Sequence, residues 1–384
     1  MKKKIVIAGI ILALSSLTFA GTGVSKESQT NVVGMKSRYF NTFYEMWAND
    51  YSTFNQILLQ PVLGATPSIN TVSLGFMEWQ MSPTTNQFAI YSGLNQKGQL
   101  ISEWLSPQNP AVGGSIDPEY YAWTYAKFQN PGVNMLLSFG GYTYGGIWDQ
   151  LANANQSQIE SLAQLLVTTC TTNYPVYNSW TWFNQTAATQ VGTVTLNGID
   201  FDFEPTTGGT TGVTEVITQA QINALSSLIA DIHALNENLM ITIDGRSCSA
   251  DGPGLTSSMG PNGTAPATAG ELVPLLQSPV MADVAYVNVM GYDSGSTYYD
   301  QTGYQQSLAN YAHYIGASKT VAGLSACSQY LGITDSISTL ETKANYISSY
   351  GYAGASFWTL GPDLIAVAQS TPMSTYTTDI ANNL

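Results

Sequence analysis

Three carboxylic acids occupy every second position of one short run of residues. The acids are Asp200, Asp202 and Glu204, and the apolar residues between them are Ile199, Phe201 and Phe203. Alternate side chains of a β-strand point to the same side, so the acids share one face while the apolar residues can pack under a helix layer. Carboxyl groups this close raise the pKa of at least one of them. An acid that keeps its proton near neutral pH is what general acid catalysis requires.

An edge strand whose polar face lies in water is the alternative interpretation of this run. Charged residues make up only 9% of the chain, so three of them on one strand face are far more than this composition would place there by chance. Gly198 before the run and Pro205 after it are typical of a strand that enters from a tight turn and stops abruptly. We therefore favour a catalytic site.

Alternating strand and helix patterns must position these acids. Apolar β-rich segments are found at residues 71–77, 133–139, 198–203, 239–244, 284–290, 320–324 and 354–358, with an ambiguous first strand at residues 38–44. Helical periodicity is found at residues 156–168, 219–235, 305–314 and 338–350. The alternation predicts an α/β fold, a single (β/α)8 TIM barrel. Chemistry in such barrels occurs at the C-terminal strand ends, so Glu204 is predicted at the rim, Asp202 one layer below and Asp200 deeper.

Other predicted strand ends carry residues that suit the same pocket. One strand ends in Ser138, Phe139, Gly140 and Gly141, where the glycines permit close approach of another chain or a ligand. Another ends in Met290, Gly291, Tyr292 and Asp293, and the last ends near Trp358. Each feature alone has an ordinary structural explanation, as a turn, a polar strand end or a core tryptophan. Together, at the same end of the predicted barrel, they describe one binding pocket.

The N-terminus and the overall charge indicate an exported protein. Lys2, Lys3 and Lys4 precede an apolar stretch and then small residues up to Ala20, the pattern of a signal peptide over residues 1–20. Its removal leaves a catalytic domain at residues 21–384 and changes the formal net charge from −14 to −17, because three lysines are lost. Such an acidic surface repels nucleic acid and anionic membranes, so we expect a neutral or cationic partner.

The cysteines and histidines do not indicate metal or serine–histidine chemistry. Cys170, Cys248 and Cys327 are widely spaced and match no metal-ligand pattern, and His233 and His313 each lie in a helical pattern. By barrel position, Cys248 and Cys327 should both emerge at the catalytic end. In an oxidising compartment we predict a bridge between these two, with Cys170 as a buried free thiol.

These motifs resemble those of glycoside hydrolase family 18, the chitinases and their relatives. Residues 196–204 are similar to its D-G-x-D-x-D-x-E signature, with Asn197 at the first acid position. Residues 138–141 resemble its S-x-G-G strand, residues 288–293 resemble its M-x-Y-D strand, and Trp358 matches the tryptophan that floors the sugar site. The resemblance covers the barrel from about the second strand to the last.

The resemblance implies a role for each residue. Glu204 protonates the leaving glycosidic oxygen and then acts as base toward water, while the substrate's own acetamido group is the nucleophile. Asp202 holds the acetamido nitrogen and Tyr292 its carbonyl oxygen. Asp200 shares a proton with Asp202, Ser138 hydrogen-bonds this acid pair, Trp358 supplies an apolar plate, and Asp293 contacts the sugar or positions Tyr292. Gly140 and Met290 complete the implied substrate site, and no metal or organic cofactor is needed.

Two connections depart from the family's usual form. Only about 25 residues separate Leu324 from Gly351, which precedes the last predicted strand. They are too few for the α+β insertion that walls the groove in many members, so we expect an open groove and endo-type, weakly processive cleavage. Residues 171–194 form a long aromatic connection at the N-terminal end of the barrel strands, away from the catalytic end. We interpret it as a packing element or a remote contact surface. Its aromatic residues are Tyr174, Tyr177, Trp180, Trp182 and Phe183. The loop at residues 245–270 leaves the catalytic end, where it can line substrate subsites.

Three functions are compatible with the sequence. The first is a secreted, monomeric chitinase that cuts β-1,4 bonds of N-acetylglucosamine polymers. The second is an endo-β-N-acetylglucosaminidase acting on N-linked glycans, which the missing insertion keeps open. The third, from a different class, is a non-catalytic chitin-binding lectin. The acid Glu204 argues against the lectin, because inactive relatives typically lose it.

Overall fold

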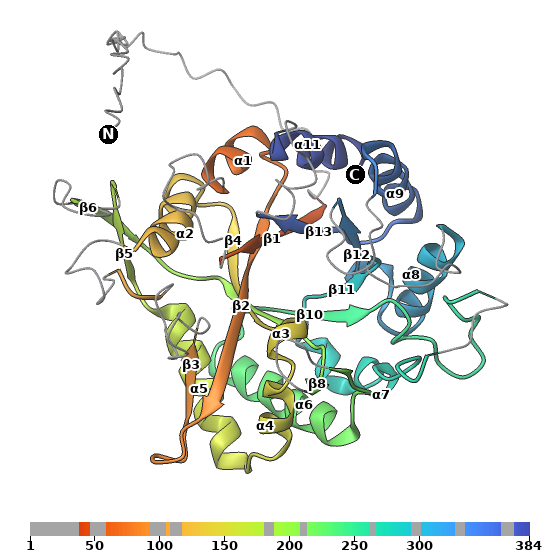
Figure 1. The fold of residues 1–384 in the computed structure, drawn as a ribbon, viewed down its shortest axis with the longest axis horizontal. Helices are drawn as coiled ribbons and strands as arrows, with labels where there is room; N and C mark the ends of the chain where they lie inside the picture. Colours follow the sequence, from red (N-terminus) through yellow and green to blue (C-terminus); the bar gives the residue numbers. More distant parts are fainter. Residues whose placement is uncertain are drawn as a thin grey trace, which may run out of the picture. The chain divides into compact units, whose positions relative to one another are not determined.

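Eight parallel strands close into a barrel in the computed structural model of this protein (Figure 1). The structure describes residues 38–46, 59–91, 105–107, 117–179, 188–207, 213–260, 266–292, 301–326, 335–361 and 372–384. The barrel strands are β1 (Tyr39–Glu45), β2 (Thr71–Met81), β4 (Asn134–Gly140), β7 (Gly198–Asp202), β10 (Met240–Arg246), β11 (Tyr286–Met290), β12 (Thr320–Ser325) and β13 (Gly354–Leu360). Strand β1 pairs with both β13 and β2, and this double pairing closes the sheet.

Helices connect successive strands and lie outside the barrel (Figure 1). The longer ones are α2 (Pro118–Gln129), α5 (Gln156–Thr171), α6 (Gln219–Leu235), α8 (Gln301–Ile315), α9 (Ile337–Tyr350) and α11 (Met373–Asn383). Shorter ones are α1 (Leu59–Ala65), α3 (Gly141–Tyr144), α4 (Ile147–Ala152), α7 (Val273–Leu276), and the 3-10 turns at Pro279–Ala282 and Ala317–Lys319. The predicted TIM barrel is therefore confirmed, including the ambiguous first strand. None of the described helices is long and apolar enough to cross a membrane.

Helix α2 and a β-hairpin were not predicted from the sequence. Asp117 caps α2 by accepting hydrogen bonds from the backbone N–H groups of Glu119 and Tyr120, and Pro118 occupies its first turn. Apolar residues are buried nearly all around this helix, which hides the helical period. Strand β2 continues beyond the barrel and pairs with the antiparallel strand β3 (Phe88–Tyr91).

The apolar side of the acid-bearing strand packs as predicted. Ile199, Phe201 and Phe203 each have 0% of their surface exposed. The ring of Phe201 lies 6.4 Å from that of Trp79 and 6.3 Å from that of Trp148. These aromatic contacts fix the outer face of β7 against Trp79 of β2 and Trp148 of α4, and so they fix the direction in which the acids point.

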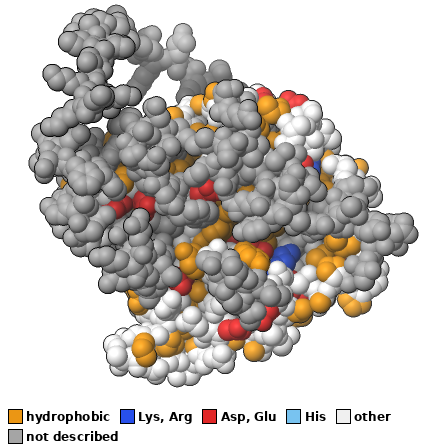
Figure 2. Space-filling model, viewed as in Figure 1, with side chains coloured by type: hydrophobic (Ala, Val, Ile, Leu, Met, Phe, Trp, Pro, Cys, Tyr) orange, Lys and Arg blue, Asp and Glu red, His pale blue; other side chains and the backbone are white. Residues whose placement is uncertain are grey.

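The connection between the last two strands is short. Strand β12 ends at Ser325 and α9 begins at Ile337, so only residues 326–336 precede the helix. That length leaves no room for a folded α+β insertion. Among the described side chains that are coloured in Figure 2, red acidic groups occur at several places and blue basic groups at fewer.

The aromatic connection before β7 forms a hairpin of β5 (Tyr174–Tyr177) and β6 (Gln190–Val194). The ring of Tyr174 lies 5.1 Å from that of Trp123 and 6.3 Å from that of Tyr120, both on α2. This part of the connection therefore packs against the outer helix layer. Trp180, Trp182 and Phe183 lie outside the described residues.

The cysteines agree with only part of the prediction. Cys170 is a buried free thiol, as predicted. Cys248 is also a buried free thiol, and its sulfur faces the Thr268 hydroxyl at 3.5 Å. The predicted Cys248–Cys327 bridge is therefore not formed in this structure, and Cys327 lies outside the described residues.

Replacing Phe201 tests the packing that orients the acids. Phe201→Ala should lower the free energy of unfolding by about 3–5 kcal/mol, because it leaves a cavity between two tryptophan rings. Phe201→Leu, which keeps more volume, should cost less. Urea unfolding followed by tryptophan fluorescence measures both. Equal stability of the alanine variant and the wild type would contradict this packing role.

Candidate active site

The register of four neighbouring strands places the polar side chains in layers. The deepest layer joins Ser138 of β4, Asp200 of β7 and Thr242 of β10. The next layer joins Gly140, Asp202, Asp244 and Asn288, the last of these on β11. Arg246 pairs with Met290 one layer higher, and Glu204 follows the end of β7. Because side chains alternate along each strand, all these layers face the barrel interior.

Asp200 lies in the deepest layer and is fully buried. Ser138 donates a hydrogen bond to its Oδ2 at 2.7 Å, and the Thr242 hydroxyl donates to its Oδ1. Burial raises the pKa of Asp200, and these hydrogen bonds oppose part of the rise. Ser138 therefore contacts the buried acid as the resemblance implies, and it is itself fully buried.

Asp202 lies nearer the rim, with 4% of its surface exposed. Burial raises its pKa well above the ordinary value, and the charges of Glu204 and Asp200 raise it further, while Arg246 lowers it. Its Oδ1 is buried and receives no hydrogen bond from the described residues. A substrate N–H group is the kind of donor that this oxygen lacks.

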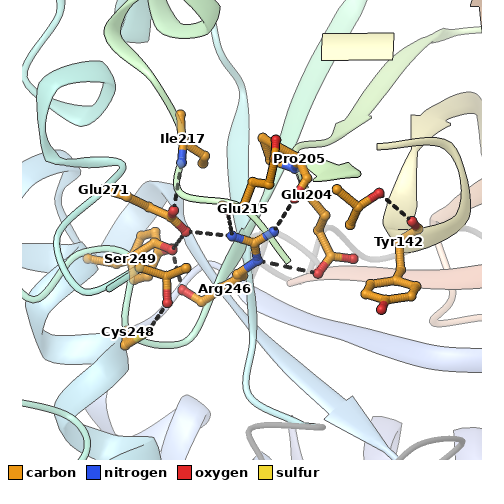
Figure 3. Close-up of polar contacts among 12 residues, drawn as sticks. Tyr142, Glu204, Pro205, Glu215, Ile217, Arg246, Cys248, Ser249 and Glu271 are labelled. Carbon is orange, nitrogen blue, oxygen red and sulfur yellow. Dashed lines mark hydrogen bonds and ion pairs between the residues drawn. The ribbon is translucent and has the colours of Figure 1, made fainter. Parts of the chain in front are cut away.

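Glu204 is the most accessible of the three acids, with 20% of its side chain exposed. Arg246 Nε lies 3.6 Å from its Oε1 (Figure 3). The predicted order, from rim to interior, thus corresponds to the observed decrease in exposure. A partly exposed carboxyl group just beyond the C-terminal end of β7 can exchange protons with water or with a bound molecule.

Arg246 is held by other contacts besides Glu204. Its Nη1 donates to Glu271 Oε1 at 3.0 Å and to the backbone oxygen of Glu215 at 3.0 Å, and its Nη2 donates to the backbone oxygen of Pro205 at 3.2 Å (Figure 3). The Glu271 side chain is fully buried and also accepts hydrogen bonds from Ser249 and Ile217. The guanidinium group is therefore a fixed cation beside the rim acid.

An aromatic stack joins Phe76 of β2, Trp358 of β13 and Tyr292, which follows β11. Trp358 lies between Tyr292, at 6.5 Å between ring centres and 17° between planes, and Phe76, at 5.6 Å and 19°. Trp358 and Tyr292 are only partly buried. Parallel, partly exposed rings of this kind suit the apolar face of a sugar.

Gly140 and Met290, two predicted binding residues, lie at the C-terminal ends of β4 and β11. Gly140 has a φ of 105°, and a Cβ there would lie 2.3 Å from the backbone oxygen of Asp202 and 2.7 Å from the Trp148 ring. The close approach at Gly140 is thus made by β7 and α4. Met290 lies beside Arg246 in the register and is partly buried. Asp293 lies outside the described residues.

The sequence interpretation missed Asp244, Arg246 and Phe76. A signal for the first two was present, because Thr242, Asp244 and Arg246 alternate on β10 as the acids do on β7. Phe76 gave no signal, since it lies in a continuously buried strand. No group of three histidine, cysteine or acidic side chains among the described residues is placed to hold a metal ion.

Replacing Arg246 tests its pairing with buried Glu271. Arg246→Met should lower the free energy of unfolding by about 3–5 kcal/mol, because a carboxylate stays buried without its cation. Arg246→Met combined with Glu271→Gln should recover part of that loss. Chemical denaturation of the single and double variants measures the difference. A single variant as stable as the wild type would rule out a stabilising pair.

Solved structures with a similar fold include enzymes that act on amino sugars. The catalytic domain of the psychrophilic chitinase B from Arthrobacter TAD20 is 12% identical, with a TM-score of 0.56 over 90% of this chain and 95% of that chain. A fungal endo-β-N-acetylglucosaminidase from glycosyl hydrolase family 18 is 15% identical, with a TM-score of 0.55 over 90% of this chain and 98% of that chain. At these identities the likeness establishes the fold alone.

The sequence itself establishes the family. No curated protein sequence matches this chain. The family model described as glycosyl hydrolases family 18 matches residues 42–334. That span includes the acids of β7, the paired acid of β10 and Tyr292 of the aromatic stack. Because the match covers more than half of the chain, this protein belongs to glycosyl hydrolase family 18.

Proposed function

We propose that this protein is a secreted chitinase that cleaves β-1,4 bonds of N-acetylglucosamine polymers with retention of configuration. One observation carries the proposal: the accessible Glu204 follows the strand that bears the buried Asp202, whose Oδ1 lacks a donor, and the stack of Trp358 and Tyr292 lies at the same, C-terminal end of the barrel strands. This arrangement offers a proton donor, an acceptor for an acetamido N–H and a plate for a sugar ring. No second rim carboxylate on β7 is placed to act as nucleophile.

The proposed mechanism uses the substrate's acetamido group. Glu204 donates its proton to the leaving glycosidic oxygen while the acetamido carbonyl oxygen attacks the anomeric carbon. Asp202 accepts the acetamido N–H and stabilises the positive charge that develops on the ring formed. Tyr292 donates to the carbonyl oxygen and keeps it in line. Glu204, now ionised, removes a proton from the water that opens the intermediate and restores the configuration.

Two features support a polymeric substrate: the length of one connection and the net charge of the protein. The connection at residues 326–336 is too short for a folded insertion, so we expect an open substrate groove that a long chain can enter and leave, which favours endo-type cleavage. An acidic molecule suits a neutral polysaccharide. The lysines and apolar stretch before Ala20 support export, and we propose that the enzyme acts as a monomer.

An endo-β-N-acetylglucosaminidase is the second candidate. The missing insertion favours it, and a solved fungal enzyme of that activity has a similar fold. The third candidate, a non-catalytic chitin-binding lectin, is disfavoured because Glu204 is present and accessible.

Glu204→Gln tests the acid directly. The variant keeps the shape and hydrogen-bonding size of the side chain, so we expect folding and sugar binding to persist while kcat falls by about 10²–10⁴-fold. Hydrolysis of a chitooligosaccharide, with binding measured by calorimetry, separates the two effects. Normal turnover by a folded variant would remove Glu204 from the role, and binding without turnover in the wild type would support the lectin.

A panel of substrates tests the mechanism and the substrate class. Chitooligosaccharides should be cleaved, whereas the matching glucose oligomers lack the internal nucleophile and should not be. A thiazoline analogue of the intermediate should inhibit. Preferential release of glycans from a high-mannose glycoprotein would favour the second candidate, and equal rates on glucose and N-acetylglucosamine oligomers would refute substrate assistance.

A further inference from the structure

A third carboxyl group lies beside the two buried acids of β7. Asp244 of β10 has 1% of its surface exposed. The strand register pairs it with Asp202 on one side and with Asn288 of β11 on the other. The mechanism proposed above assigns no role to this acid. A buried carboxyl group at this level needs an explanation, because burying another negative charge here is costly.

The hydrogen bonds show which carboxyl oxygens act as acceptors. Both oxygens of Asp200 accept, one from Ser138 and the other from Thr242. Asp244 Oδ1 accepts an N–H bond from Asn288 at 2.5 Å. Asp244 Oδ2 is buried, and no N–H or O–H donor among the described residues reaches it.

The side chains of Asp200 and Asp244 lie within hydrogen-bonding reach of each other. Two ionised carboxylates offer only acceptors, so a hydrogen bond between them requires a proton. Since both oxygens of Asp200 already accept, Oδ2 of Asp244 is the oxygen left to hold that proton. The pair then has one negative charge, on Asp200.

We propose that Asp244 is a positioning residue that carries a proton on Oδ2 and through it donates a hydrogen bond to the ionised Asp200. Asp202 then stays free to face the sugar. The resemblance to the family implies instead that Asp200 shares its proton with Asp202. Here the sharing runs sideways, between β7 and β10. Asp200, the deeper acid, is satisfied by its neighbours. Asp202 Oδ1 is buried and receives no hydrogen bond from the described residues, so it is left to accept the acetamido N–H, a consequence that rests on the proposed function.

The charges around the pair support this placement. Burial raises the pKa of Asp244 well above its ordinary value, the charges of Asp200 and Asp202 raise it further, and the bond from Asn288 opposes the rise. The hydrogen bond between the pair lowers the pKa of Asp200 and raises that of Asp244. The other groups facing the pair are Ser138 of β4, Ser73 of β2, Tyr39 of β1 and Thr242 of β10, while Arg246 acts on Asp202.

Two substitutions separate the proton from the volume of the side chain. Asp244→Ala removes the donor to Asp200, so we expect kcat on a chitooligosaccharide to fall by about 10- to 100-fold. Asp244→Asn should recover most of that loss, since its Oδ1 accepts from Asn288 and its Nδ2 donates to Asp200 as the protonated acid does. Asp231→Asn is the matched control: its carboxylate on α6 accepts a bond from Gln156 and should not affect turnover. Equal losses in the alanine and asparagine variants would overturn the proposal.

Proton binding gives a second test that needs no activity. A carboxyl group with a raised folded-state pKa adds stability at low pH, which is lost as the pH rises through that pKa. Between the unfolded pKa of about 3.9 and the raised folded value, the native wild type holds a proton on Asp244 that the unfolded chain has released. The dependence of unfolding free energy on pH should therefore decrease by about one proton in Asp244→Asn.

The pH dependence of stability and the hydrolysis assay test the role of Asp244 and the proposed function separately. An unchanged pH dependence in Asp244→Asn would show that Asp244 is ionised in the native protein and would overturn the proposal, whatever the activity. Absence of hydrolysis by the wild type would overturn the proposed function, while the proton count would still decide the state of Asp244. The asparagine variant, which preserves shape, keeps the test valid if the alanine variant does not fold.

Discussion

The burial of carboxyl groups at the centre of the barrel is the constraint on which the site depends. Asp200, Asp202 and Asp244 lie where water cannot solvate them, so their charges must be met by protein donors or neutralised by protons. The barrel interior is accordingly polar at this depth. Hydroxyl groups from β4 and β10 and an amide from β11 meet the acids. A further chain of bonds joins Asn41 to Ser356 and Ser73 across β1, β13 and β2.

The rim follows a different electrostatic rule from the interior. Glu204 is partly solvated and has a fixed guanidinium group nearby, whereas the hydrogen-bond partners of Asp200 and Asp244 are neutral hydroxyl and amide groups. Arg246 is itself anchored by the buried Glu271 and by backbone oxygens from the segment after β7. The strand end, the following turn and the loop after β10 are thus tied together around the acid that is proposed to move the proton. Protonation deep in the barrel and proton transfer at the rim are supported by separate sets of contacts.

Alternation along strands made much of the fold and the motif predictable. Asp200, Asp202 and Glu204 could be recognised because a period of two separates them from apolar residues on a short strand. Helix α2 could not, because its aromatic residues are buried nearly all around and leave no amphipathic period. Asp244 shows a different limit. Its position beside the acids of β7 depends on the register between β7 and β10, and no local pattern encodes how two strands whose paired residues are 42 positions apart align.

That register has a consequence for how the chain finds its native state. Side chains alternate between the two faces of the barrel wall, so a slip of one residue between β7 and its neighbours would exchange the faces. The slipped arrangement would push Asp200 and Asp202 under the helices and turn Phe201 into the barrel interior. Such a state would bury the carboxylates away from the hydrogen-bond donors Ser138 and Thr242, and it would break the aromatic contacts with Trp79 and Trp148. The same acids that are proposed for catalysis therefore make a misaligned register of β7 unfavourable in free energy during folding.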